Sequence, residues 1–195
     1  MSVLVTKEAP LFTAQAVMAD NSIKELSLKS YKGKYVLMFF YPLDFTFVCP
    51  SEIIAFDRAL DEFKKRDCEV LGISVDSQYS HYAWKNTPVN SGGIGNIQFP
   101  LIADLDKSIA EAYDVLLPDG ISLRGIFLID REGIVRHQLV NDLPLGRSVE
   151  EALRVVDALQ FTEKYGEVCP ANWKPGEEAM KPTAEGVAEY LRKTN

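Results

Sequence analysis

The run Tyr35-Val-Leu-Met-Phe-Phe-Tyr41 is continuously apolar and rich in aromatic residues, and Pro42 ends it. A continuous apolar run of this length predicts a strand that is buried on both faces, as in the centre of a parallel sheet. The segment that follows, residues 51–65, carries apolar residues at helical spacing. A buried strand followed by an amphipathic helix predicts an α/β protein with helices on both faces of a sheet.

Sequence patterns on either side of this segment predict the remaining elements. We expect strands at residues 14–17, 23–26, 69–75, 99–103, 125–129 and 134–140, and helices at residues 81–86, 148–162 and 184–193. The last two strands form a hairpin, which adds an antiparallel pair to a mainly parallel sheet. A mixed central sheet flanked by helices indicates a thioredoxin-like fold. Pro, Gly and Glu become frequent after Thr162, so we divide the chain into a thioredoxin-like domain, residues 1–162, and an extended C-terminal tail, residues 163–195.

The composition excludes several classes of protein. The chain has 195 residues, a net charge of −7, 47% hydrophobic residues and 25% charged residues, which is typical of a globular protein and not of a disordered one. The acidic charge argues against nucleic-acid binding. The longest apolar run, residues 35–43, is about half of the ~20 residues that a membrane helix needs. The first residues do not resemble a signal peptide, so we expect a cytoplasmic protein.

The numbers and spacing of cysteine and histidine exclude further classes. The chain has three cysteines and two histidines, all far apart in the sequence, which is not the spacing of a zinc site. It has no Cys-x-x-Cys, so it lacks the local dithiol of a thioredoxin-type exchanger. An odd number of unclustered cysteines also argues against a secreted scaffold held together by disulfides.

Cys49 lies between the predicted buried strand and the predicted helix, at the edge of the sheet where α/β proteins usually place ligands. Unpaired N–H groups and the helix dipole favour a thiolate at a helix N-terminus. Thr46 precedes Cys49 by three residues, so its hydroxyl can face the sulfur, and Pro42 and Pro50 make the approach rigid. The alternative is a buried structural cysteine, which is a frequent role for a lone cysteine.

The other two cysteines call for different interpretations. Cys169 lies in Glu167-Val-Cys-Pro170, a polar and proline-rich segment, so we expect it to be exposed. An exposed thiol is a liability unless it has a function or a partner, and the alternative is an incidental surface cysteine. Cys68 lies in Arg66-Asp-Cys-Glu69, where carboxylates on both sides disfavour the thiolate, so we expect a structural role.

Together these segments resemble a known family. Pro42-x-x-x-Thr46-x-x-Cys49 resembles the active-site signature of peroxiredoxins. The second Val-Cys-Pro, residues 168–170, resembles the resolving site of typical 2-Cys peroxiredoxins, the group that includes thioredoxin peroxidases and the bacterial alkyl hydroperoxide reductase peroxidase subunit. The resemblance covers nearly the whole chain and includes residues 9–12, 45–52, 76–77, 81–84, 124–130, 141–147 and 189–190. It implies an elaborated thioredoxin fold and an enzyme that reduces peroxides with thiols.

The resemblance also implies a catalytic cycle. The Cys49 thiolate attacks hydrogen peroxide or an organic hydroperoxide, becomes a sulfenic acid and releases water or an alcohol. Cys169 of the other subunit then forms an intersubunit disulfide, which thioredoxin or a flavoprotein disulfide reductase reduces. Sequence separation alone is compatible with a bond within one subunit or between two. No metal, haem or flavin is required, so we expect no cofactor.

The same resemblance assigns roles to further residues. Arg124 donates to the sulfur and the peroxide, Thr46 hydrogen-bonds both, and Pro42 shields the sulfur. Glu52 and Arg147 form a supporting pair that positions Arg124. From the residues alone, a solvated charge at a strand end is the preferred interpretation of Arg124. A surface salt bridge is the alternative for Glu52 and Arg147.

The resemblance implies a homodimer that assembles into a decamer. Phe45, Phe47 and Trp84 are candidate packing residues between dimers, and ordinary core residues are the alternative for each. Two positions depart from relatives that are easily overoxidised: Ile94, in Gly92-Gly-Ile-Gly95, replaces Leu, and Leu191, after Tyr190, replaces Phe. These two elements slow the unwinding of the active site in the family, so the departures put overoxidation sensitivity in question.

Two other functions remain open on the sequence. A thiol–disulfide oxidoreductase would use the same fold, but the missing Cys-x-x-Cys argues against it. A ring-forming holdase with a vestigial thiol would protect client proteins without consuming peroxide, and the set of residues around Cys49 argues against it.

Overall fold

The structure is a computed structural model that describes residues 2–194. These residues divide after Val149 into two compact units, here called unit 1 and unit 2. The long helix α5 (Val149–Tyr165) contains residue 162, where the composition changes. The boundary between the units therefore lies earlier than the change in composition. The reason is that α5 contacts the segment that follows it, where the ring centroids of Phe161 and Trp173 lie 4.8 Å apart.

Unit 1 is built on one seven-stranded mixed sheet, in the order β2-β1-β5-β4-β3-β6-β7. Strands β3, β4 and β5 are parallel, whereas β1, β2, β6 and β7 add antiparallel pairs at the two sides. This arrangement confirms the predicted mixed sheet. The strands are β1 (Thr13–Val17), β2 (Ile23–Ser27), β3 (Tyr35–Phe40), β4 (Cys68–Ser74), β5 (Leu101–Ala103), β6 (Arg124–Ile129) and β7 (Val135–Asn141).

Strand β3 lies inside the sheet, between β4 and β6. All six of its residues are buried, as the continuous apolar run predicts. It runs parallel to β4, where Tyr35 pairs with Cys68, and antiparallel to β6, where Val36 pairs with Ile129. Because β6 runs in the opposite direction, its first residue, Arg124, lies at the same end of the sheet as the last residues of β3. The topology thus places Arg124 and the segment after β3 at one edge.

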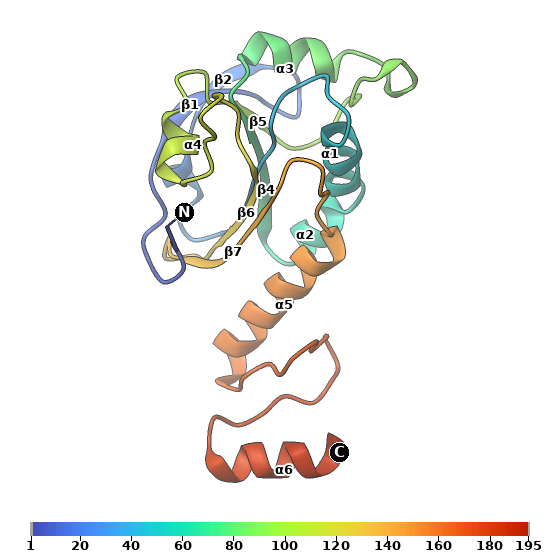
Figure 1. The fold of residues 1–195 in the computed structure, drawn as a ribbon. Helices are drawn as coiled ribbons and strands as arrows, with labels where there is room; N and C mark the ends of the chain where they lie inside the picture. Colours follow the sequence, from blue (N-terminus) through green and yellow to red (C-terminus); the bar gives the residue numbers. More distant parts are fainter. Residues whose placement is uncertain (1, 195) are drawn as a thin grey trace. The chain divides into compact units, whose positions relative to one another are not determined.

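Helices cover both faces of this sheet. In Figure 1, α1 and α2 lie on one side of the strands and α4 on the other. The helices of unit 1 are α1 (Cys49–Arg58), α2 (Leu60–Lys65), α3 (Gln78–Lys85) and α4 (Ser108–Ala112), with single 3₁₀ turns at Leu28–Tyr31 and Val89–Ser91. The sequence did not predict α4, because five residues are too few to show helical periodicity.

The helix predicted over residues 51–65 is two helices, which is a correction. The chain leaves helical geometry at Ala59, where ψ is 2°. Phe56 and Phe63, one on each side of the break, are both fully buried with ring centroids 6.1 Å apart. The break therefore lets both rings reach the core.

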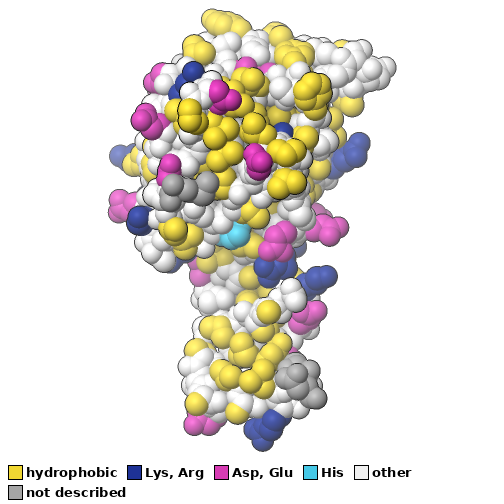
Figure 2. Space-filling view, viewed as in Figure 1, with side chains coloured by type: hydrophobic (Ala, Val, Ile, Leu, Met, Phe, Trp, Pro, Cys, Tyr) yellow, Lys and Arg dark blue, Asp and Glu magenta, His cyan; other side chains and the backbone are white. Residues whose placement is uncertain are grey.

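Unit 2 consists of α5, α6 (Ala184–Thr194) and the irregular segment between them. An isolated bridge between Val168 and Met180 and the buried ring of Trp173 hold this segment together. Apolar side chains gather on the face of unit 2 that Figure 2 shows. Tyr165, Val187 and Leu191 are among the large apolar residues exposed in unit 2. Within residues 2–194, no helix combines the length and the apolar character needed to cross a membrane.

Candidate active site

Cys49 is the first residue of α1, and its side chain is completely buried. The segment 41–48 leads to it from the end of β3, and Pro50 occupies the first turn, where a missing N–H costs nothing. No side chain caps this helix. The first turn of an uncapped helix offers unpaired N–H groups and the positive end of the helix dipole, and both stabilise a negative sulfur.

Two side chains reach the Cys49 sulfur. The Thr46 hydroxyl lies 3.0 Å and the Arg124 Nη1 atom 3.4 Å from Sγ. The Thr46 hydroxyl also lies 2.8 Å from the Leu43 carbonyl oxygen. Because a hydroxyl has only one hydrogen, Thr46 can accept from the thiol while donating to Leu43, or donate to the thiolate. Thr46 therefore suits both protonation states of Cys49.

A buried ion network holds Arg124 in place. Glu52 accepts from Arg124 Nη1 at 2.6 Å and from Arg147 Nε at 2.8 Å. The Arg124 Nε atom donates to the Leu143 carbonyl oxygen at 2.6 Å. All three charged side chains are buried, so the surface interpretations of Arg124, Glu52 and Arg147 are wrong. A planar guanidinium that is fixed at several atoms presents its remaining N–H groups in one direction.

Arg147 ties this network to the sheet. Its Nη1 atom donates to the Phe40 and Gly125 carbonyl oxygens, each at 2.7 Å. Burial lowers the pKa of Arg147, and the Glu52 carboxylate opposes this shift. Two arginines and one glutamate leave one positive charge, which a thiolate at Cys49 neutralises. The network therefore places one net positive charge beside the sulfur.

A hollow of about 410 Å³ lies beside this group. Its walls are mostly apolar, and Arg124 is the charged residue among them. The residues that line it are Pro42, Leu43, Thr46, Phe47, Val48, Ile121, Arg124, Leu143 and Pro144. The structure thus brings the predicted residues Pro42, Thr46 and Arg124 to one hollow, where a small polar molecule would meet a fixed donor in apolar surroundings.

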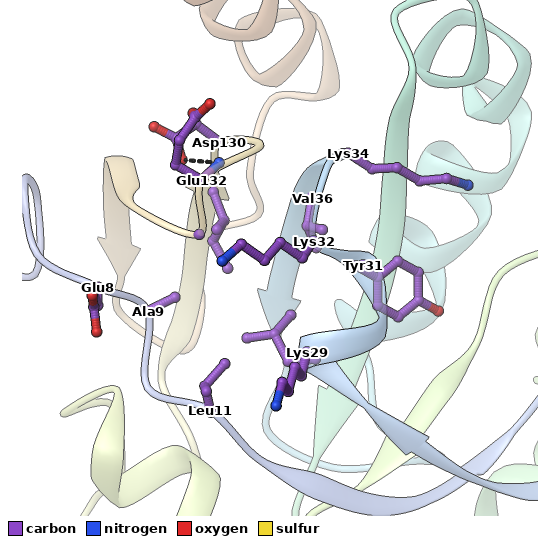
Figure 3. Close-up of a pocket in the computed structure, with 13 residues that line it drawn as sticks. Glu8, Ala9, Leu11, Lys29, Tyr31, Lys32, Lys34, Val36, Asp130 and Glu132 are labelled. Atoms are coloured by element: carbon purple, nitrogen blue, oxygen red, sulfur yellow. Dashed lines mark hydrogen bonds between the residues drawn. The ribbon is translucent and has the colours of Figure 1, made fainter.

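A second hollow, of about 170 Å³, lies at the opposite end of the sheet and is shown in Figure 3. Lysines, Tyr31 and Asp130 surround it, and its lining includes neither cysteine nor histidine. Burial raises the pKa of Tyr31 to about 12, which keeps this phenol protonated near neutral pH. The chemistry therefore belongs to the hollow beside Cys49.

Comparison with known proteins agrees with this geometry. Residues 5–138 match the family model described as the AhpC/TSA family, and residues 158–193 match the C-terminal domain of 1-Cys peroxiredoxin. This chain belongs to the peroxiredoxin family. Peroxiredoxin-2 of Cricetulus griseus is 56% identical, over 98% of this chain and 96% of that protein.

Solved structures give the same assignment. The reduced 2-Cys peroxiredoxin of Plasmodium vivax is 59% identical with a TM-score of 0.96, over 98% of this chain and 100% of that one. Thioredoxin peroxidase I of Plasmodium yoelii is 60% identical with a TM-score of 0.80, over 88% of this chain and 99% of that one. This peroxiredoxin is a thiol-dependent peroxidase with an antioxidant function, on a thioredoxin-like fold.

The two other cysteines of this peroxiredoxin differ sharply. Cys68 is buried, and burial, reinforced by Glu69 and Asp67, raises the pKa of its thiol to about 12. Cys169 is half-buried rather than exposed as expected, because it lies against α5, where its Sγ is 3.7 Å from the Ala158 carbonyl oxygen. Cys68 therefore fits a structural role, whereas Cys169 keeps some access to solvent.

The aromatic candidates of this peroxiredoxin separate into two kinds. Trp84 is fully buried and donates its indole N–H to the Gly92 carbonyl oxygen at 3.0 Å, so the core interpretation is correct for it. Phe45 is 54% and Phe47 is 96% exposed, so neither is a core residue within this chain.

One part of the site was not predicted. Asp44, between Pro42 and Thr46, accepts from the Tyr41 hydroxyl at 2.9 Å, from His81 Nδ1 at 2.8 Å and from the Ser80 hydroxyl at 2.7 Å. The only signal in the sequence is a carboxylate within an otherwise apolar segment. Two of these three partners, Ser80 and His81, lie more than thirty residues away, and no pattern in the sequence connects them to Asp44.

Proposed function

We propose that Cys49 is the peroxidatic nucleophile of this enzyme. Its thiolate attacks one oxygen of a hydroperoxide, the O–O bond breaks, and the other oxygen leaves as water or an alcohol after taking up a proton. The sulfur becomes a sulfenic acid. The observation that carries this proposal is the approach of Arg124 Nη1 and Thr46 Oγ1 to Sγ, at 3.4 and 3.0 Å.

The surrounding residues have distinct roles in this step. Arg124 stabilises the negative charge that develops on the peroxide oxygens, and it needs no reorganisation because Glu52 holds it. Thr46 donates to the thiolate and orients the peroxide, while Pro42 keeps water from the sulfur. Arg147 and Glu52 are positioning residues, because their contacts reach Arg124 and the sheet.

Cys169 of the partner subunit is the proposed resolving residue. Its thiolate attacks the sulfur of the Cys49 sulfenic acid, the S–O bond breaks as the disulfide forms, and the hydroxide that leaves takes up a proton from solvent to become water. Cys49 is fully buried, so the first turn of α1 must unwind before another sulfur can reach it. Cys169 lies in the segment that matches a peroxiredoxin C-terminal domain, and the Plasmodium vivax neighbour is named a 2-Cys peroxiredoxin. Both observations support this role.

Thioredoxin is the proposed reductant of the disulfide, and a flavoprotein disulfide reductase is the alternative. The Plasmodium yoelii neighbour is named a thioredoxin peroxidase, which supports the first. We place the protein in the cytoplasm, with residues 1–162 as peroxidase domain and residues 163–195 as the tail that carries the resolving cysteine.

The enzyme is proposed to act as a homodimer that assembles into a decamer. Phe47 is 96% exposed, and unit 2 carries further exposed apolar side chains. A unit of this size exposes such residues at a cost unless another surface covers them. Analytical ultracentrifugation of the reduced protein tests the assembly, and a monomer at micromolar concentration would contradict it.

The decisive test of the chemistry is peroxide consumption with a thioredoxin system. We expect turnover by the wild type and by Cys68→Ser, and none by Cys49→Ser. Cys169→Ser should oxidise once and then stop, because its sulfenic acid has no resolving thiol. Thioredoxin-coupled turnover by Cys49→Ser at the wild-type rate would contradict the proposal.

A further inference from the structure

Asp44 is anchored to the body of unit 1 at both its side chain and its backbone. Its carboxylate accepts three hydrogen bonds, from Tyr41, Ser80 and His81. Its backbone N–H donates to Asp76 Oδ2 at 2.8 Å. Asp44 is only 7% exposed and lies two residues before Thr46. The segment that carries the active-site threonine is therefore fixed to α3 and to the end of β4.

His81 is fully buried, and both of its ring nitrogens have hydrogen-bond partners, with Nδ1 lying 3.3 Å from the Tyr41 hydroxyl as well as near Asp44. Nε2 lies 3.1 Å from the Ile102 carbonyl oxygen, which only accepts, so Nε2 donates. Nδ1 lies 2.8 Å from the Asp44 carboxylate, which also accepts. The fully buried imidazole thus links the buried Asp44 carboxylate to β5. A buried hydrogen-bonded pair of this kind holds its partners in one geometry, because separating them leaves buried polar groups without partners.

The residue after Asp44 has a strained backbone. Phe45 has a φ of 54°, in the left-handed region that bulky residues rarely adopt. Its ring is half exposed and lies 5.6 Å from the Trp84 ring. A conformation of this kind persists only where the surroundings enforce it. The anchored Asp44 supplies that enforcement on one side of Phe45, and Thr46 follows on the other.

We propose that the Asp44–His81 pair is a latch that holds segment 42–48 in the conformation that reduces peroxide. While the pair is intact, Thr46 is held against the Cys49 sulfur. When it separates, the strain at Phe45 relaxes and the segment leaves the sulfur free to form a disulfide. This inference rests on the proposed role of Cys49. Neither Asp44 nor His81 touches the sulfur, so both are positioning residues.

The latch makes opposite demands on the two chemical steps. Oxidation by peroxide needs the closed segment, whereas disulfide formation needs the open one. Weakening the pair should therefore slow the first step and accelerate the second. General destabilisation of the domain would not divide the two steps in this way.

Two substitutions of His81 separate its two hydrogen bonds. The amide nitrogen of Gln takes the place of Nε2, so His81→Gln keeps the bond to Ile102 and loses the bond to Asp44. The amide nitrogen of Asn takes the place of Nδ1, so His81→Asn does the reverse. Single-turnover fluorescence of the reduced full-length protein mixed with hydrogen peroxide resolves the two steps, because the Trp84 ring contacts Phe45.

We expect the two variants to differ in the ratio of their oxidation rate to their rate of disulfide formation. His81→Gln should be oxidised about tenfold more slowly or worse, and should form the disulfide faster, because small misplacements of catalytic groups are costly. His81→Asn should retain the wild-type ratio of the two rates. If His81→Gln does not fold, Ser80→Ala removes one donor to Asp44 and should shift both rates in the same directions by a smaller factor. Equal ratios in wild type, His81→Gln and Ser80→Ala would overturn the latch.

Asp130→Asn is the matched control. Asp130 is also buried, accepts backbone N–H groups and pairs with Arg136, but it lies at the far end of the sheet (Figure 3). The Asp130→Asn substitution should lower the melting temperature without changing the ratio of the oxidation rate to the rate of disulfide formation. A change of ratio as large as that of His81→Gln would also overturn the latch. Failure of the proposed function is distinguishable, because it would appear as peroxide consumption by Cys49→Ser.

Discussion

At the scale of single residues, Arg124 differs from an ordinary arginine at the start of a strand. Its guanidinium makes its contacts inside the protein, to Leu143, Glu52 and Cys49. A buried arginine of this kind contributes to stability, and in the proposed mechanism also to catalysis, whereas a solvated one would contribute to neither. The sequence placed Arg124 at the strand entry, but its burial depends on Glu52, a residue 72 positions away.

Arg124→Ala should slow the oxidation of Cys49 by at least ~100-fold, which is the cost of losing one donor to a transition state. It should also destabilise the fold by about 3 kcal/mol, because Glu52 loses one of its two buried partners. Stopped-flow oxidation and urea denaturation measure the two effects. Arg136→Ala, which removes a half-exposed arginine bound to Asp130, should leave the oxidation rate unchanged. An unaltered second-order rate constant for oxidation of Arg124→Ala by peroxide would contradict the role of Arg124 as a donor to the sulfur and the peroxide.

Lys85 gives a prediction about pH. It is buried with its amine 2.6 Å from the Met18 carbonyl oxygen, and burial lowers its pKa to about 8. The unfolded chain keeps this proton to about pH 10, so between these values the unfolded state binds more protons. Stability of the wild type relative to Lys85→Met should therefore rise with pH, by about 2 kcal/mol between pH 8 and 10. Denaturation curves of both proteins at each pH measure the difference, and a constant difference would contradict it.

At the scale of elements, the sequence predicted a helix or strand correctly where its apolar pattern fits only one kind of element. The apolar run 35–41 predicted β3 because a strand buried on both faces needs no polar alternation. The pattern failed at Ala59, because a break that keeps Phe56 and Phe63 buried leaves the apolar spacing almost unchanged. It also failed for the contacts of Asp44, since His81 lies 37 residues away and is brought near only by the sheet.

The loop at residues 92–95 and helix α6 give a prediction about overoxidation. Gly93 has no room for a side chain, since an added Cβ would lie 1.9 Å from the Thr87 carbonyl oxygen, and Ile94 is buried. We propose, from the resemblance to sensitive relatives, that α6 slows the unwinding of the active site. Leu191 offers less apolar area than the Phe of those relatives, which should weaken this effect by on the order of 1 kcal/mol. We expect intermediate resistance, greater sensitivity in Leu191→Phe, and loss of sensitivity on truncation before Ala184.

Mass spectrometry of sulfinic Cys49 during turnover, across a series of peroxide concentrations, measures this sensitivity. Cys68 serves as the internal control, because its raised pKa should leave it reduced throughout. Identical overoxidation of the truncated and full-length proteins would show that α6 does not protect the closed site.

At the scale of the whole molecule, the resemblance to peroxiredoxins predicted the family and the activity. The assembly of subunits depends on exposed surfaces, which the pattern of apolar residues in the sequence does not reveal. From the sequence, Phe47 is a candidate packing residue between dimers, with an ordinary core residue as the alternative, and in the structure it is almost fully exposed. An aromatic residue in an apolar run has the same pattern whether its own chain or a second copy covers it. The pairing of Cys49 with Cys169 is open for the same reason.

One equivalent of peroxide should convert the protein into a covalent dimer on a non-reducing gel. Cys49→Ser and Cys169→Ser should each prevent the doubly bonded dimer, because each removes one sulfur from both bonds. Cys68→Ser should leave the dimer unchanged, since this thiol is buried in β4. A monomer band whose peptide map joins residues 49 and 169 would show that the disulfide forms within one subunit.

The bonds from Arg147 to the Phe40 and Gly125 carbonyl oxygens have a consequence for genetics. The same side chain that binds Glu52, and that we propose positions Arg124, also donates to the backbone of two neighbouring strands. A carrier of a substitution at Arg147 would therefore lose protein abundance and enzymatic rate through one lesion. Overexpression of the variant would restore the protein abundance but not the rate of each enzyme molecule. The activity per molecule would therefore stay low at any gene dosage.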